Sequence, residues 1–160
     1  MDELLTLMLI KAVHVVAASI WIGSIISLSL AVRVVRRFVG SPASIAISSE
    51  MGRRLRPLTR TSLYLAIVSG ALLAIQRGFL SALLAFAFEY RPVVLVLLKV
   101  MLGTAVLILV EYHSSLGASI ARIANANGAR ALRRRIVIVG WATVALSIAM
   151  AVLGTALRFG

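Results

Sequence analysis

The stretch VVLVLLKVMLGTAVLILV, residues 93–110, contains a single charged residue, Lys99. A helix rises 1.5 Å per residue, so this stretch is long enough to cross most of the roughly 30 Å hydrocarbon core of a bilayer. Pro92 stands directly before it, and proline suits the first turn of a helix. The stretch therefore predicts a transmembrane helix.

Further apolar runs of comparable character occur on both sides of this stretch, at 4–32, 58–75 and 136–157. The segment 78–88 is also apolar but too short to cross, so we expect it to lie in the membrane interface or to dip back. Short connections and alternating direction favour antiparallel neighbours. The prediction is an all-α, integral membrane antiparallel four-helix bundle, a single transmembrane domain over residues 1–160.

The overall composition agrees with a membrane protein. Of the residues, 61% are hydrophobic and 14% charged, against roughly 45–50% and about a quarter in soluble domains. The net charge of +12 is also compatible with nucleic-acid binding, but such proteins carry basic residues on a polar, soluble surface. Here the arginines stand between apolar runs, so the lipid bilayer, not nucleic acid, is the expected partner. The chain has no cysteine, which excludes disulfides, thiolate metal sites and c-type haem attachment.

The connections between the apolar runs differ in charge. Residues 33–60 hold seven arginines and one glutamate, and residues 113–135 hold five arginines. Residues 77–91 hold two arginines and one glutamate. Because positive charge marks the cytoplasmic side, both termini are expected outside, in a multi-pass protein of the cell (plasma) membrane. The stretch GSPASIAISS, residues 40–49, is the expected flexible segment.

Polar residues inside the spans are functional candidates, because a charge in the hydrocarbon region is costly. Lys11 and His14 lie one helical turn apart, and Trp21 extends the same face. With both termini outside, His14 and Lys99 are each roughly 9 to 15 Å below the outer boundary. His113 follows Lys99 by about 21 Å along its helix and belongs near the cytoplasmic interface. A haem held by His14 and His113 of one protomer is therefore disfavoured.

Two methionines fall at a depth comparable to that of His14 and Lys99, namely Met101 and Met150. A cluster of these four side chains is geometrically possible in the outer half of the bundle. Histidine with methionine or another weak ligand suits haem iron, and imidazole with thioether suits Cu(I). Small residues, including Ser69 and Gly70 in the second span and Gly140, Ser147 and Gly154 in the fourth, favour close helix packing.

Three stretches resemble one group of membrane proteins. KAVH at 11–14, followed by WIG at 21–23, resembles the first helix of HemJ-type and CopD-like proteins. MGRRLRPLTRT at 51–61 resembles the HemJ-type M-x-R-R-L segment before the second helix. LLKVMLGTAVLILVEYH at 97–113 resembles a third helix that carries an intramembrane lysine and ends in Tyr-His. The chain lacks the late histidine of the HemJ first helix, and its lysine lies about one turn further from Tyr-His.

The resemblance implies a haem b-binding redox protein that acts in porphyrin oxidation or membrane electron transfer. His14 is then the haem-linked histidine, Lys99 the essential intramembrane lysine, and Arg53 and Arg54 the basic pair before the second helix. Lys99 and Lys11 would offset propionate charge, Trp21 would line the site and Gly103 would leave room for the ring. In an enzyme of this kind, a protoporphyrinogen oxidase-like oxidoreductase, the cofactor performs the chemistry.

Two alternatives stay open beside the haem protein. The first is a CopD-like protein for copper uptake or handling. Its metal ligands would come from one imidazole and thioether set, His14, Met101 and Met150, with His113 as a further candidate. The second alternative is a non-catalytic accessory subunit, acting in a homo-oligomer or in a larger membrane complex.

Overall fold

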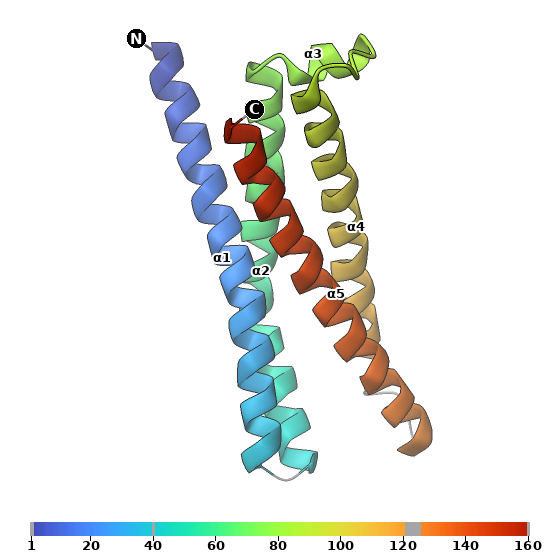
Figure 1. Ribbon diagram of the computed structural model, residues 1–160. Helices are drawn as coiled ribbons and strands as arrows, with labels where there is room; N and C mark the ends of the chain where they lie inside the picture. The colour runs from blue at the N-terminus through green and yellow to red at the C-terminus, as the bar shows by residue number, and fades with distance from the viewer. Residues whose placement is uncertain (1, 40, 121–125, 160) are drawn as a thin grey trace. The chain divides into compact units, whose positions relative to one another are not determined.

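The computed structural model describes residues 2–39, 41–120 and 126–159, and the regular structure in these ranges is helical (Figure 1). The helices are α1 (Asp2–Phe38), α2 (Ser41–Gln76), α3 (Phe79–Leu84), α4 (Arg91–Ile120) and α5 (Ala126–Phe159). Within the described residues, all but the short α3 are long and apolar enough to cross a membrane, which gives four candidate spans. The predicted all-α membrane fold is confirmed, and the chain is a multi-pass protein in contact with lipid.

The chain divides into two compact units, Met1–Val96 and Leu97–Gly160. In the first unit α1 packs along α2, and α3 contacts the end of α2. In the second unit the body of α4 packs against α5. The long helices of each unit run antiparallel, as the alternating topology of the sequence predicts.

The helices extend beyond the predicted apolar spans. α2 begins at Ser41, not near residue 58, so residues 41–49 form helical turns where the sequence analysis expected a flexible segment. That expectation is wrong because Ser44 is buried and Glu50 bonds Arg53 and Arg54 one turn further along the helix. Such i,i+3 and i,i+4 pairs stabilise a helix that has little hydrophobicity.

The segment between α2 and α4 is short and aromatic. Gly78 adopts a left-handed conformation (φ 69°), which glycine accepts at no steric cost, and the six-residue α3 follows it. Phe79 and Tyr90 approach each other with ring centroids 6.4 Å apart, and Phe86 and Phe88 with centroids 5.9 Å apart. The prediction that this segment is too short to cross is confirmed.

The outward faces of the long helices are strongly apolar. Several large aliphatic side chains are more than half exposed, namely Leu9, Val16, Val68, Val100, Ile108 and Val152. Apolar surface of this extent is rare on soluble monomers, whereas the hydrocarbon core of a bilayer solvates it well. The surfaces between paired helices combine apolar side chains such as Trp21 and Val106 with small polar residues such as Ser69 and Ser147, and small residues of this kind are common in membrane bundles.

Candidate functional site

The imidazole of His14 lies against α2 in the first unit. Its Nδ1 is 2.8 Å from the carbonyl oxygen of Ala66 and 3.2 Å from the hydroxyl of Ser69. A carbonyl oxygen only accepts, so Nδ1 carries the proton and donates to Ala66. The Ser69 hydroxyl in turn donates to carbonyl oxygens of its own helix. This arrangement fixes the ring orientation and leaves the lone pair of the neutral imidazole on Nε2.

Gly70 provides the space that this imidazole occupies. A Cβ atom built on Gly70 would lie only 2.9 Å from Cε1 of His14 and 3.3 Å from its Nδ1. Carbon atoms at optimal contact are about 3.5–4.0 Å apart. The ring therefore reaches the carbonyl of Ala66 only because position 70 has no side chain.

The contact at His14 sets the register of α1 against α2. Since the helices are antiparallel, moving seven residues along α1 to Trp21 corresponds to moving seven residues back along α2, to Ser62 and Leu63. All three side chains are buried, each with 5% of its surface exposed. Trp21 therefore belongs to the core of the first unit. It lies on the same face of α1 as His14, as the sequence predicts.

Three contacts define how α4 packs against α5 in the second unit. The Cβ positions of Gly154, Gly103 and Gly140 lie 3.4 Å from Lys99 Nζ, 3.5 Å from Met150 Cε and 3.5 Å from His113 Cε1, respectively. Four residues forward from Lys99 to Gly103 correspond to four residues back from Gly154 to Met150. Ten residues forward from Gly103 to His113 correspond to ten residues back from Met150 to Gly140. One antiparallel register accounts for all three contacts.

The same register brings Val106 level with Ser147 and Val110 level with Thr143. We call the facing rows the α4–α5 seam: Lys99, Gly103, Val106, Val110 and His113 on α4, and Gly154, Met150, Ser147, Thr143 and Gly140 on α5. Val106, Ser147 and Thr143 are buried, as this placement requires. Steps of four and three residues along both helices are the spacing of a coiled-coil interface.

The hydroxyl groups of the seam are bonded within their own helix. Ser147 donates to the carbonyl of Thr143 at 2.8 Å, and Thr143 donates to the carbonyl of Val139 at 2.9 Å. These two bonds satisfy both hydroxyl donors within α5. Both residues act here as small side chains that let α4 and α5 approach closely.

The structure brings some of the predicted site residues together and leaves others apart. Lys99, Met150, Gly103 and His113 all lie on the seam. Met101, two residues after Lys99, points about 200° around α4 and is 61% exposed. Lys11, on α1, is exposed, as expected for a lysine near a helix end whose ammonium reaches the interface.

The space beside Gly103 is filled by a methionine. The methyl group of Met150 lies against Gly103, at the place where the sequence analysis proposed that glycine would leave room for a cofactor ring. Gly103 in this structure accommodates a side chain of α5.

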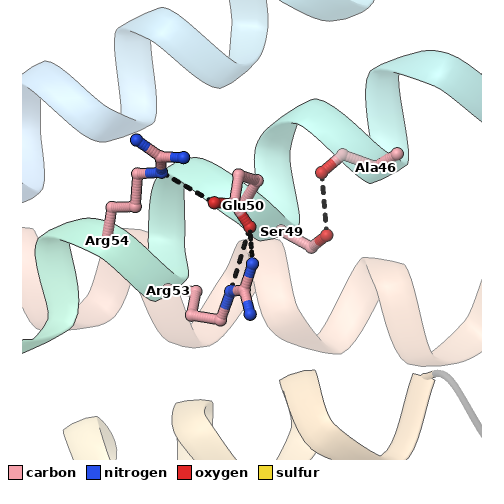
Figure 2. A network of polar contacts seen from close by, with 5 residues as sticks. All are labelled: Ala46, Ser49, Glu50, Arg53 and Arg54. Atoms are coloured by element: carbon pink, nitrogen blue, oxygen red, sulfur yellow. Dashed lines mark hydrogen bonds and ion pairs between the residues drawn. The ribbon is translucent and has the colours of Figure 1, made fainter.

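Arg53 and Arg54 form a surface network with Glu50, shown in Figure 2. Nε and Nη2 of Arg53 donate to Oε2 of Glu50, and Nε of Arg54 donates to Oε1 at 2.7 Å. The two arginine side chains are 77% and 80% exposed. The sequence analysis did not predict Glu50 as a partner, although its position one turn before both arginines is typical of an ion pair within a helix.

Compared with protein-family models, curated proteins and solved structures, the chain matches none. Among the described residues, no group of three or more His, Asp or Glu side chains is arranged to hold a metal ion.

Proposed function

We propose that the protein is a haem b-binding redox protein of the membrane and that Nε2 of His14 is an axial ligand. The observation that carries the proposal is the bond from Nδ1 of His14 to the carbonyl of Ala66. The resemblance of KAVH and WIG in α1 to HemJ-type and CopD-like proteins adds support.

The donor chemistry of His14 fits haem iron. A histidine that binds a metal usually donates its other ring N–H to a carbonyl or carboxylate, which fixes the tautomer and makes the ligating nitrogen more basic. His14 has this arrangement within an apolar stretch of α1, and a single imidazole is a sufficient protein ligand on one side of a haem. Buried Ala17 and Trp21 continue the same face with apolar atoms.

The cationic residues have a complementary role in this proposal. Lys11 precedes His14 by one turn and is exposed, so its ammonium would pair with a propionate and orient the group. Lys99 is proposed as a further functional cation by its resemblance to the intramembrane lysine of the HemJ-type third helix. When bound, haem supplies one-electron chemistry, and the protein residues bind it, orient it and exclude water.

The test is an absorption spectrum of the full chain, purified after expression with added haem precursor. We expect a Soret band that shifts on reduction, persists in His113→Ala and is lost in His14→Ala. Ser69→Ala is the matched control, because it removes a neighbour of Nδ1 and keeps the acceptor carbonyl of Ala66. Circular dichroism verifies that each variant is helical. A colourless wild-type preparation, or a Soret band unchanged in His14→Ala, contradicts the proposal.

The same sample distinguishes the alternatives. Stoichiometric copper without haem, lost in His14→Ala, would favour the copper-handling role. A stoichiometric second protein in a preparation free of cofactor would favour an accessory subunit.

A further inference from the structure

The middle part of α2 carries four arginines within eight residues, Arg53, Arg54, Arg56 and Arg60, which we call the arginine cluster. Arg53, Arg56 and Arg60 follow steps of three and four residues and share one face of the helix. Arg53, Arg54 and Arg56 are exposed. Glu50 is the single acidic residue between 33 and 60, so the cluster has a large excess of positive charge.

The register of α1 against α2 gives the depth of this cluster. Ten residues beyond His14 on α1, Ser24 is level with Arg60, and sixteen residues beyond it, Leu30 is level with Arg54. The α1 residues between these levels are uncharged. From Arg77, at the other end of α2, to Arg60 the helix rises about 25 Å, close to the thickness of the hydrocarbon core. The arginine cluster thus begins where the lipid headgroups of one leaflet lie.

Glu50 forms weak ion pairs with two residues of the cluster, Arg53 and Arg54. Its two carboxylate oxygens accept from Arg53 and Arg54, and the bond from Arg54 drawn in Figure 2 comes from Nε. An ion pair this exposed contributes little stability. A phosphate group offers several acceptor oxygens and binds guanidinium groups through paired hydrogen bonds. A lipid phosphate within reach of these long, exposed side chains therefore competes well with Glu50.

We propose that the arginine cluster binds the phosphate of an anionic phospholipid in this leaflet, and that Glu50 competes with the lipid for Arg53 and Arg54. The carboxylate keeps the two guanidinium groups paired when no anionic lipid is bound. Its removal therefore strengthens lipid binding, whereas removal of the arginines weakens it. This proposal is independent of any cofactor.

The test is native mass spectrometry of the full chain in neutral detergent, titrated with phosphatidylglycerol, phosphatidylcholine or inorganic phosphate. We expect the wild type to bind phosphatidylglycerol in preference to the other two. Arg53→Gln with Arg54→Gln lowers that affinity about tenfold, and Glu50→Gln raises it about threefold, in line with the effect of single charges at membrane surfaces. The increase in Glu50→Gln cannot arise from misfolding.

Arg36→Gln with Arg37→Gln is the matched control, since it removes the same charge from the exposed last turn of α1. The proposal requires that this control retain the wild-type affinity for phosphatidylglycerol. An equal loss of affinity for phosphatidylglycerol in both double variants would show that net charge alone determines binding, and it would overturn the proposal. Unchanged or weaker binding in Glu50→Gln, or equally tight binding of inorganic phosphate, overturns it as well.

Discussion

At the residue scale, three polar side chains within the spans share one feature, which is contact with a glycine of the neighbouring helix. His14 lies against Gly70, Lys99 against Gly154, and His113 against Gly140. A polar group in a membrane helix is stabilised by close helix approach and by backbone acceptors. The absent glycine side chains allow both, so each polar residue depends on its opposite glycine.

Replacing Gly70 with alanine tests this dependence. The new Cβ would lie 2.9 Å from His14 Cε1, so the ring must move away from the carbonyl of Ala66. We expect a loss of about 1–2 kcal/mol from overpacking and the weakened bond, measured by unfolding titration in detergent. Gly52→Ala is the control on the same helix, because nothing lies within 4 Å of its Cβ position. A stability in Gly70→Ala equal to that of Gly52→Ala would show that the ring is not confined.

Replacing Lys99 with methionine separates structural from functional use of this lysine. The two side chains have similar length, but the ammonium group is costly inside the hydrocarbon region. We expect the apparent free energy of membrane insertion of α4 to improve by about 2 kcal/mol in Lys99→Met, measured by a glycosylation-based insertion assay. Unchanged insertion would mean that the ammonium already reaches the interface at no cost.

At the element scale, the facing rows of paired helices combine small, polar and apolar residues, and the exposed faces of the long helices are aliphatic. On the α4–α5 seam, Lys99, Met150 and His113 each face a glycine, and valines face Ser147 and Thr143. A bulky residue on one helix thus meets a small residue on the other at each level. This complementarity specifies one register, because a shift along the seam would place bulky residues opposite one another.

Cysteine cross-linking tests the register directly, because the chain has no cysteine of its own. Val106→Cys with Ser147→Cys places both thiols on the seam at the same level, and we expect a disulfide on mild oxidation. Ile108→Cys with Ser147→Cys is the control, since Ile108 is 64% exposed and lies on another face of α4. Gel mobility under non-reducing conditions distinguishes the products. Efficient cross-linking of the control pair, or none in the first pair, would refute the register.

At the scale of the whole molecule, the arginine-rich connections predict that both termini lie outside the membrane. In that predicted orientation the short α3 segment would face outward, and the end of α1 and the start of α2 would face the cytoplasm. Because Arg60 is level with Ser24, the apolar run of α1 continues past the first arginines of α2. The α1–α2 hairpin therefore extends beyond the headgroup layer on the arginine-rich side.

Labelling of single cysteines tests this orientation in intact cells. Ser81→Cys, in the exposed part of α3, is expected to react with a membrane-impermeant maleimide. Ala43→Cys, exposed near the start of α2, is expected to react only after permeabilisation. The reversed pattern would show that the positive charges face outward.

Hydropathy was sufficient to predict the fold, because runs such as 93–110 have no stable alternative to a membrane helix. It was insufficient for residues 41–57, whose helix depends on contacts with α1 and on the pairs of Glu50 rather than on apolar length. At the candidate site, the sequence was sufficient to single out His14 as a polar residue in an apolar span, and Ser69 and Gly70 as small residues. The contact between these residues could not be predicted, because it depends on the register of two helices that are distant in the chain. The acceptor at Ala66 could not be predicted either, because it is a backbone atom that every residue type carries.

The backbone acceptor of His14 has a genetic consequence. A main-chain carbonyl survives every substitution at position 66 that keeps the helix, so exchanging Ala66 for another small residue leaves the bond intact. Random mutagenesis scored for the loss of the oriented imidazole would therefore yield changes at Gly70 and single-residue insertions or deletions in α2, which rotate the carbonyl away by about 100°. Exchanges of the buried Ala66 for other small residues would remain nearly silent, although position 66 holds the proton acceptor.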